Sequence, residues 1–302
     1  MTYPRSHLVD PAGGIYHVCS RCVRKAFLCG IQSGHDFDHR RQWIEDRLIF
    51  LSGIFAVDIL AYAVMSNHYH IVLDVKTAVP LAWSDEEVVN KWIALNPGAK
   101  DNHETIKIRA KSLLADKNYL TELRERFGSL SWFMRYLNEP LARLANKEDN
   151  CTGRFWEGRF KSQRLLDAQA ILACMVYVDL NPVRAAMASK ASESQHTSLS
   201  RRLIETADKH APLTVINKHD PNLPFELSLN DYISLVNWTA EAHALKESGV
   251  TFDFPDPYLW LKNAFPGPGC WQRARGSIQS IKTYAMTLGQ RWIRTQKPYF
   301  FP

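Results

Sequence analysis

The chain has 302 residues, of which 46% are hydrophobic and 23% charged, a balance typical of globular proteins with a sizeable core. No apolar run is long enough to span a bilayer and residues 1–14 lack the apolar core of a secretory signal, so we expect a cytoplasmic protein without a membrane partner. The net charge of +6 fits a nucleic-acid partner but does not establish one.

Six cysteines are present, and without an export signal they are expected to be reduced thiols rather than disulfides. Cys19 and Cys22 form a C-x-x-C pair. A structural zinc site usually needs a second such pair, and the sequence has none. These cysteines are therefore expected to be small buried residues or loop thiols.

The first part of the chain predicts three strands and a helix. Alternating residues over 14–23 are typical of a strand, and apolar residues at helical spacing predict a helix over 38–51. Two further strands are predicted over 54–64 and 68–75. The short link Met65-Ser66-Asn67 between them predicts a hairpin.

Residues 76–127 predict a helical insertion. Ser84 with Glu87 three residues later has the pattern of a capping box at the start of a helix. Asn96-Pro97-Gly98 should end that helix. A single charged helix is then predicted over roughly 104–126.

The clearest amphipathic helix is predicted over 129–147, with a kink expected at Pro140. A short strand over 159–166 follows, and Asp167 is expected to cap a helix that stops at Asn181-Pro182.

From about residue 190 the composition changes. The Ser/Thr/His-rich stretch 192–200 predicts a surface connector, followed by helices near 228–246 and 270–294. Four tryptophans in this part are expected to pack a small core: Trp238, Trp260, Trp271 and Trp292. The basic stretch 272–275 is a weak candidate for DNA contact.

His68-Tyr69-His70 places two imidazoles on one face of the predicted strand, because side chains alternate along a strand. Two imidazoles on a rigid strand form a plausible half of a divalent-metal site. The alternative is two unrelated histidines of the core or surface.

Tyr177 and Asn181 lie four residues apart on a predicted helix and therefore share one face. A phenol with a pKa of about 10 is a poor nucleophile, but it can attack a phosphodiester whose phosphate is polarised by a metal ion. The alternative is that Tyr177 is a core residue and that Asn181 caps the helix end.

Residues 153–164 alternate cations with aromatic residues. Cations can contact phosphates and aromatic faces can stack on unpaired bases. The alternative is a loop and edge strand with ordinary solvated charges. The residues that we predict to contact DNA are Arg154, Trp156, Arg159, Lys161 and Arg164.

Taken in this order, the motifs resemble the single-tyrosine HUH transposases of the insertion-sequence-200-like group, and most closely the REP-associated tyrosine transposases of bacteria. The resemblance covers roughly residues 14–190. It rests on YHVCSRCVRKAFL at 16–28, YAVMSNHYHIVL at 62–73, GRFWEGRFKSQRLLD at 153–167 and YVDLNPVRA at 177–185.

The resemblance implies an α+β fold, a ferredoxin-like plait with an antiparallel sheet and helices on one face (the HUH endonuclease fold). It implies a catalytic domain over 1–190 that contains the insertion, followed by a mainly helical accessory region over 191–302. His68 and His70 match the metal ligands of the family, with Tyr69 in place of the usual aliphatic residue.

By the same resemblance, Tyr177 is the nucleophile and Asn181 matches the position of the third ligand of Mg²⁺ or Mn²⁺, where other branches of the class carry Gln. Glu157 is a competing candidate for this third ligand. The implied activity is nicking and strand transfer of single-stranded or REP-like hairpin DNA through a 5′-phosphotyrosine. The enzyme would act as a monomer or homodimer in the bacterial cytoplasm.

Three alternatives remain open at this point. The first is a relaxase or replication initiator of the same HUH class, although the sequence has no G-x-x-x-x-G-K-[ST] loop for a fused helicase. The second is a domesticated DNA-binding protein that no longer cuts. The third, a metal hydrolase of small molecules, predicts no salt-sensitive DNA affinity.

Overall fold

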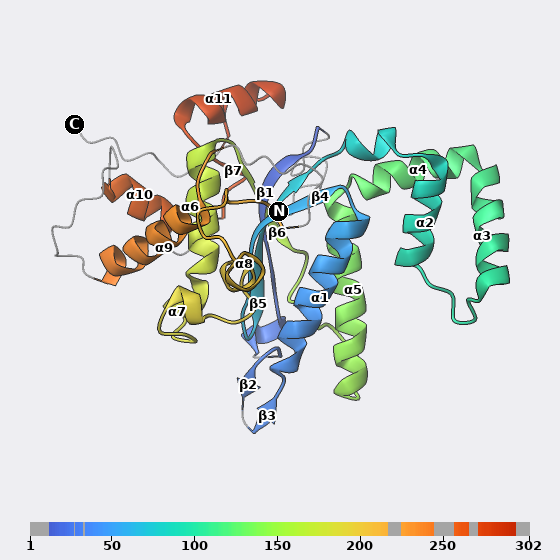
Figure 1. The fold of residues 1–302 in the computed structure, drawn as a ribbon, viewed down its shortest axis with the longest axis horizontal. Coiled ribbons are helices and arrows are strands. Elements are labelled where there is room, and N and C mark those ends of the chain that lie inside the picture. Colours follow the sequence, from blue (N-terminus) through green and yellow to red (C-terminus); the bar gives the residue numbers. More distant parts are fainter. Residues whose placement is uncertain are drawn as a thin grey trace.

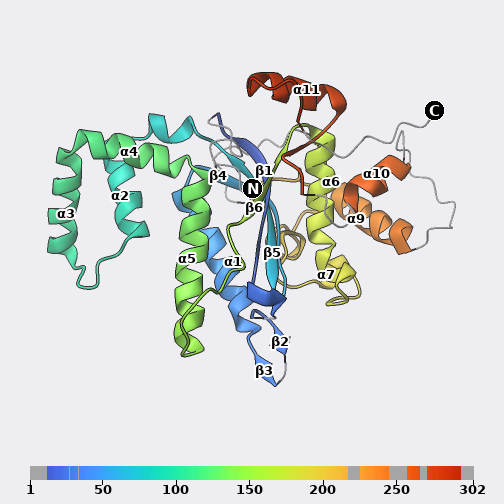
Figure 2. The ribbon, with the colours of Figure 1, turned by 180° about the vertical axis from the view of Figure 1, so that it is seen from behind.

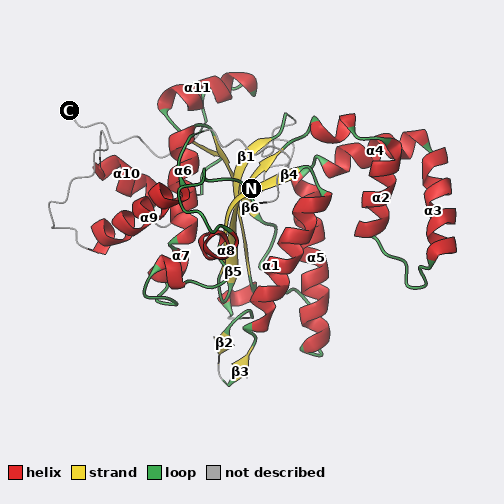
Figure 3. Cartoon of the chain, in the orientation of Figure 1, coloured by secondary structure: helices red, strands yellow, loops and turns green. Residues whose placement is uncertain are grey.

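The fold is built around one five-stranded sheet (Figures 1 and 3). The computed structural model describes residues 12–26, 28–32, 34–216, 225–244, 257–265 and 271–293. The strand order is β4-β5-β1-β6-β7, with neighbouring strands antiparallel except for the parallel pair β6 and β7. The strands are β1 (Gly14–Arg21), β4 (Val57–Val64), β5 (His68–Val75), β6 (Lys161–Leu165) and β7 (Ala274–Arg275).

The predicted α+β plait is confirmed by the order of the elements along the chain. β1 is followed by α1 (His39–Ile54) and then by β4, and β5 lies antiparallel between β1 and β4. The second half repeats the scheme, with α5 (Leu130–Glu148) between β5 and β6. This arrangement is the split β-α-β pattern of a ferredoxin-like plait.

Helices α1 and α5 cover one face of the sheet, where Tyr16, Val18, Tyr69 and Ile71 are buried in a single apolar core (Figure 1). α5 begins at its cap Ser129 and continues past Pro140. The ends of α1 and α5 are joined through Arg40, whose side chain is buried.

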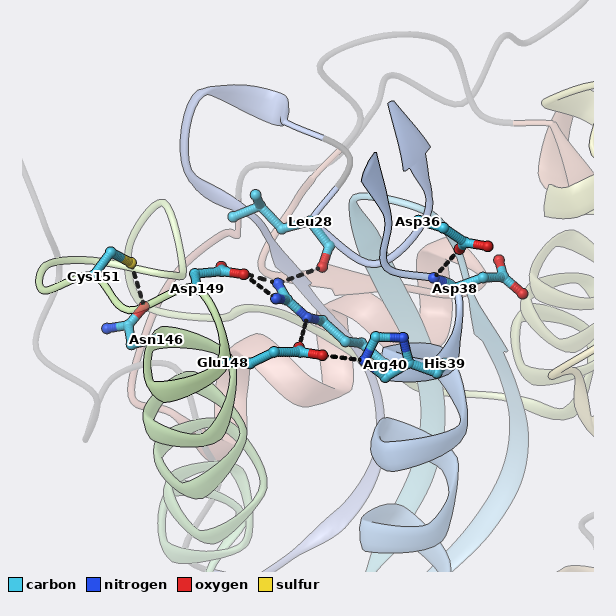
Figure 4. Close-up of polar contacts among 9 residues, drawn as sticks. All are labelled: Leu28, Asp36, Asp38, His39, Arg40, Asn146, Glu148, Asp149 and Cys151. Atoms are coloured by element: carbon cyan, nitrogen blue, oxygen red, sulfur yellow. Dashed lines mark hydrogen bonds and ion pairs between the residues drawn. The ribbon is translucent and has the colours of Figure 1, made fainter. Parts of the chain in front are cut away.

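The Arg40 guanidinium donates to Glu148 over 2.7 Å, to the carbonyl of Leu28 over 3.1 Å, and to both carboxylate oxygens of Asp149 (Figure 4). His39 lies 2.7 Å from the other oxygen of Glu148. Because the buried cation is paired with two carboxylates, it can remain charged and fix the two helices against one another.

The insertion between β5 and α5 is helical, as predicted, and extends away from the sheet (Figure 2). It contains η3 (Val79–Ala82), α2 (Asp85–Leu95), α3 (His103–Ala115) and α4 (Lys117–Phe127). Ser84 caps α2 by accepting from the Glu87 N–H. The single helix predicted over 104–126 is wrong, because Asp116 leaves helical geometry and caps a new helix by accepting from the Tyr119 N–H.

On the opposite side of the sheet, α6 (Ala168–Asp179) packs against β4 and β5, and the elements that follow it along the chain lie on the same side. These are α7 (Asn181–Arg184), η4 (Ala191–Glu193), α8 (Ser198–Glu205), α9 (Leu229–Ala244) and α10 (Pro257–Ala264). They share a second core with β4 and β5. The expectation that helices cover one face only is therefore wrong (Figure 1).

The region after residue 190 departs from prediction in three ways. The stretch 192–200 is a surface connector only in its first part, where Ser192, Glu193 and Gln195 are exposed. Thr197 and Ser198 are fully buried, and Thr197 forms a bridge to Ala63 of β4. Trp238 and Trp260 are buried in the second core, as expected, whereas Trp292 is 73% exposed. Trp271 contacts histidines of the sheet instead.

The C-terminal extension also contributes a strand, β7, so the sheet is not wholly antiparallel. β7 is followed by α11 (Ile278–Thr287), whose first turn is attached to Asp167 through the Ser277 N–H. Three short elements follow β1: η2 (Val23–Lys25), β2 (Ile31–Gln32) and β3 (His35–Asp36). Within the described residues, no helix has the length and apolar character needed to cross a membrane.

Candidate active site

The strand register brings polar side chains together on the face of the sheet that α6 covers. Cys19 of β1 is paired with His70 of β5 on one side and with Lys161 of β6 on the other. Since residues two apart on a strand share a face, His17 and His68 belong to the same surface. The rings of His68 and His70 lie 5.0 Å apart between centroids.

Tyr177 of α6 lies against this histidine surface. Its ring centroid is 5.5 Å from that of His70 and 5.8 Å from that of His17, both in edge-to-face geometry. Residues 17, 70 and 177, far apart in the sequence, therefore meet at one point. The predicted nucleophile and the predicted metal-binding pair lie in the same site.

Hydrogen bonds fix the orientation of two of the imidazoles. His70 Nδ1 lies 2.9 Å from His17 Nε2, and His68 Nδ1 lies 2.6 Å from the side-chain amide oxygen Oδ1 of Asn67. The Asn67 amide nitrogen in turn donates to the carbonyl of Lys25 over 2.9 Å. Each histidine of the pair is thus held through its Nδ1 atom.

Burial keeps the imidazoles neutral. Desolvation, and after it the charge of Arg275, lowers the pKa of His17 to about 3. Desolvation and then Arg21 lower the pKa of His68 to about 4, and burial also holds the pKa of His70 well below its ordinary value. Neutral imidazole is the form that binds a metal ion, so the donor chemistry of this pair fits a divalent cation.

The two candidates for a third ligand lie at the border of the site. Asn181 is buried, and its amide nitrogen donates to the Tyr177 carbonyl over 2.9 Å, so it also closes the end of α6. Glu157 is exposed, and its charge acts on Cys19. Among the described residues, no three His, Cys, Asp or Glu side chains form a metal-binding group. The identity of the third ligand stays a prediction.

Three residues of the site were not predicted: His17, whose contacts are given above, Arg184 and Trp271. The guanidinium of Arg184 lies 5.3 Å from the centroid of the Tyr177 ring, and its charge also lowers the pKa of His70. Arg184 follows Tyr177 by seven residues, about two helical turns, within the motif at 177–185, and this spacing was a usable signal. The indole of Trp271 stacks on His17 at 4.6 Å and lies parallel to His70 at 6.3 Å.

The five residues predicted to contact DNA differ in their surroundings. Arg154, Arg159 and Lys161 are exposed. Trp156 is instead packed edge-to-face on Tyr69, and its indole N–H donates to the Asn138 carbonyl over 2.9 Å.

Arg164 is also engaged within the protein. Its guanidinium lies 4.9 Å from the centroid of the Tyr16 ring, on the face of the sheet opposite to His17. It fills the space beside Gly14, where a side chain would overlap it. The exposed cations are therefore better placed for phosphate contact than Arg164, and Trp156 is partly buried against Tyr69.

No family model and no curated protein sequence matches the chain. Among solved structures, the chain is similar to a REP-associated tyrosine transposase bound to a REP hairpin, with 12% sequence identity and a TM-score of 0.37. The match covers 74% of this chain and 95% of that chain.

Proposed function

We propose that this chain is a metal-dependent transposase that nicks and rejoins single-stranded or hairpin DNA with Tyr177 as its nucleophile. The observation that carries the proposal is the contact of the Tyr177 ring with the His70 ring, at 5.5 Å between centroids. The ring of His68, on the same strand, lies 5.0 Å from the His70 ring. A tyrosine next to a pair of neutral imidazoles on a rigid strand has the parts needed for attack on a metal-bound phosphate.

His68 and His70 would hold a divalent cation, Mg²⁺ or Mn²⁺, which when bound withdraws charge from the scissile phosphate. The Tyr177 oxygen forms a bond to phosphorus and loses its proton, and the bond from phosphorus to the 3′ oxygen breaks. The departing 3′ oxygen takes up a proton. The product is a 5′-phosphotyrosine and a free 3′-hydroxyl, and attack by another 3′-hydroxyl reverses the reaction without ATP.

Cations around the site favour a polyanionic substrate. Three arginines act on the histidines through their positive charge: Arg275 on His17, Arg21 on both His68 and His70, and Arg184 on His70. Arg184, over the Tyr177 ring, can also stabilise negative charge that develops on the phenol oxygen or phosphate. DNA phosphates approaching Tyr177 would therefore meet positive charge from several strands and helices.

The test is a denaturing gel of the full chain with labelled hairpin oligonucleotides from the DNA flanking its own gene, with Mg²⁺ or Mn²⁺. We expect a protein-linked DNA band that requires metal and disappears in Tyr177→Phe, while binding measured on a native gel persists. Tyr119→Phe, in the insertion, is the matched control and should retain the band. A cleaving Tyr177→Phe variant would refute the assignment.

The second candidate is a DNA-binding protein that no longer cuts. Its favouring observation is the burial of His17 and His70, which are 5% and 4% exposed beneath Trp271. Hairpin binding with no adduct under either metal would support it. A relaxase or replication initiator would use the same residues, and only the DNA substrate would separate that activity from transposition.

A further inference from the structure

Nδ1 of His68 and Nδ1 of His70 have different hydrogen-bond partners, and these partners affect how the H-x-H pair can bind a metal ion. A metal-ligating histidine uses one ring nitrogen for the metal and usually donates the N–H of the other nitrogen to an acceptor, which fixes the tautomer and the ring orientation. The acceptor is therefore part of the site although it does not touch the metal.

For His68 the acceptor is defined by the hydrogen bonds around Asn67. The Asn67 amide nitrogen donates to the Lys25 carbonyl over 2.9 Å, so its oxygen is the atom that faces His68 Nδ1 at 2.6 Å. An amide oxygen can only accept, so Nδ1 of His68 carries the hydrogen. The lone pair of His68 is then on Nε2.

For His70 the neighbouring group is His17 of the adjacent strand. The two nitrogens, His17 Nε2 and His70 Nδ1, are 2.9 Å apart and share one hydrogen. The indole of Trp271 stacks on the face of the His17 ring, with 4.6 Å between the centroids. When His70 is the donor, its Nε2 lone pair is free for a cation, as in His68.

We propose that His17 and Asn67 are positioning residues: each accepts the Nδ1–H of one histidine and thereby turns the Nε2 lone pairs of His70 and His68 toward a shared divalent cation. This inference rests on the proposed function, because it requires that His68 and His70 bind the cation. It adds that the tautomer of the pair is set by residues outside the H-x-H motif.

The experiment measures Mn²⁺ binding to the full chain without DNA, from the signal of free Mn²⁺ in electron paramagnetic resonance titrations. His17→Leu and Asn67→Ala should each weaken Mn²⁺ binding about 10–100-fold, as removal of such partners typically does. His17→Gln and Asn67→Asp retain an acceptor oxygen and should restore most of the affinity. His103→Leu, on the surface of α3, is the control and should have no effect.

A second readout counts the imidazole nitrogens coupled to bound Mn²⁺ by electron spin echo modulation. We expect two in the wild type and two in His17→Gln. Three in the wild type would overturn the inference, because His17 would then be a ligand. Unchanged affinity in both His17→Leu and Asn67→Ala, with melting curves like that of the wild type, would overturn it as well.

The same data separate this inference from the proposed function. Mn²⁺ bound through two imidazoles, with no effect of the His17 and Asn67 variants, rejects the positioning role and leaves the proposed function standing. A wild-type chain that binds no Mn²⁺ through histidine overturns both. Asn67 is only partly buried, so its variants keep the test decisive if His17→Leu fails to fold.

Discussion

Asp179, two residues after Tyr177 on α6, offers the sharpest test of how the site is held. Its carboxylate is fully buried and accepts three hydrogen bonds: from the Ser198 hydroxyl at 2.6 Å, from the Leu199 N–H at 3.1 Å and from the Tyr232 hydroxyl at 2.6 Å. These donors belong to α8 and α9. One side chain thus ties the end of α6, which carries the proposed nucleophile, to two helices of the C-terminal region.

Asp179→Ala removes the acceptor for three buried donors. Each unsatisfied donor costs about 1–3 kcal/mol, and allowing for partial relaxation we expect a loss of about 4 kcal/mol in the free energy of unfolding. An unfolding entropy of about 2.1 cal/mol/K per residue gives roughly 0.6 kcal/mol/K for a chain of this length. The melting temperature should therefore fall by about 6 °C.

Asp179→Asn separates the hydrogen bonds from the charge. The amide oxygen can still accept from Ser198 and Leu199, and the amide nitrogen can donate to the Tyr232 hydroxyl. Desolvation raises the pKa of Asp179, so its charge is held against a burial penalty. We expect a loss of only about 1 kcal/mol, or about 2 °C.

Differential scanning calorimetry of the three proteins provides the measurement, and the rate of covalent adduct formation reports on the position of Tyr177. If the melting temperature of Asp179→Ala lies within about 1 °C of the wild-type value, instead of about 6 °C below it, the proposed attachment of α6 through Asp179 is refuted. If the melting temperature falls equally in Asp179→Ala and Asp179→Asn, the negative charge of Asp179, which is balanced by the buried Arg202, matters more than its three hydrogen bonds.

Four further predictions follow from the site. Arg184→Ala should slow adduct formation in single-turnover assays by about 10²-fold, with binding nearly unchanged, if its charge acts in the transition state; equal losses of binding and rate would contradict this. Replacing Arg154, Arg159 and Lys161 by Ala should weaken DNA binding and reduce its salt dependence by about one unit of slope per lost phosphate contact, whereas Lys107→Ala on α3 should not. Trp271→Ala should speed modification of His17 and His70 by diethyl pyrocarbonate, mapped by mass spectrometry, because the indole stacks on both rings; unchanged rates would show that Trp271 does not cover them. In metal-free protein, the lowered pKa values of His17 and His68 mean that the unfolded state takes up protons first as the pH falls below about 6.5. The free energy of unfolding should therefore be at its full value above about pH 6.5. Between about pH 6.5 and about pH 4 it should fall by roughly 1.4 kcal/mol per pH unit for each of the two histidines, as measured by denaturant unfolding at each pH. The fall should be less steep in the double variant His17→Gln, His68→Gln.

The sequence predicted the elements whose signals are local. Alternation gave the strand at residue 14 and the hairpin around Ser66, and side-chain caps at Ser84 and Asp167 marked helix starts that the structure retains. The helix predicted over 104–126 failed on a local signal as well. Asp116 is a good cap residue in the middle of a charged segment, but charge periodicity continued on both sides of it.

What the sequence did not predict depends on contacts between distant residues. β7 has two residues and no periodicity of its own; it exists because β6 offers an edge. His17 and Trp271 join the site through strand register and stacking across more than 250 positions, which no spacing rule reports. Trp156 looked like an exposed stacking residue, but the plait places its indole against Tyr69.

These long-range contacts change how the C-terminal region should be understood. Asp167 at the start of α6 caps that helix and also accepts from the Ser277 N–H, while Asp179 at its end accepts from Ser198 and Tyr232. Both ends of the helix that carries Tyr177 are thus fixed by residues beyond the predicted boundary at 190. The position of Tyr177, the proposed nucleophile, depends on the distance between α6 and the strand that carries the histidines. For a reacting group, a misplacement of about 1 Å can cost about 10²-fold in rate. In the proposed mechanism the region after residue 190 is therefore part of the catalytic geometry rather than an appendage to it.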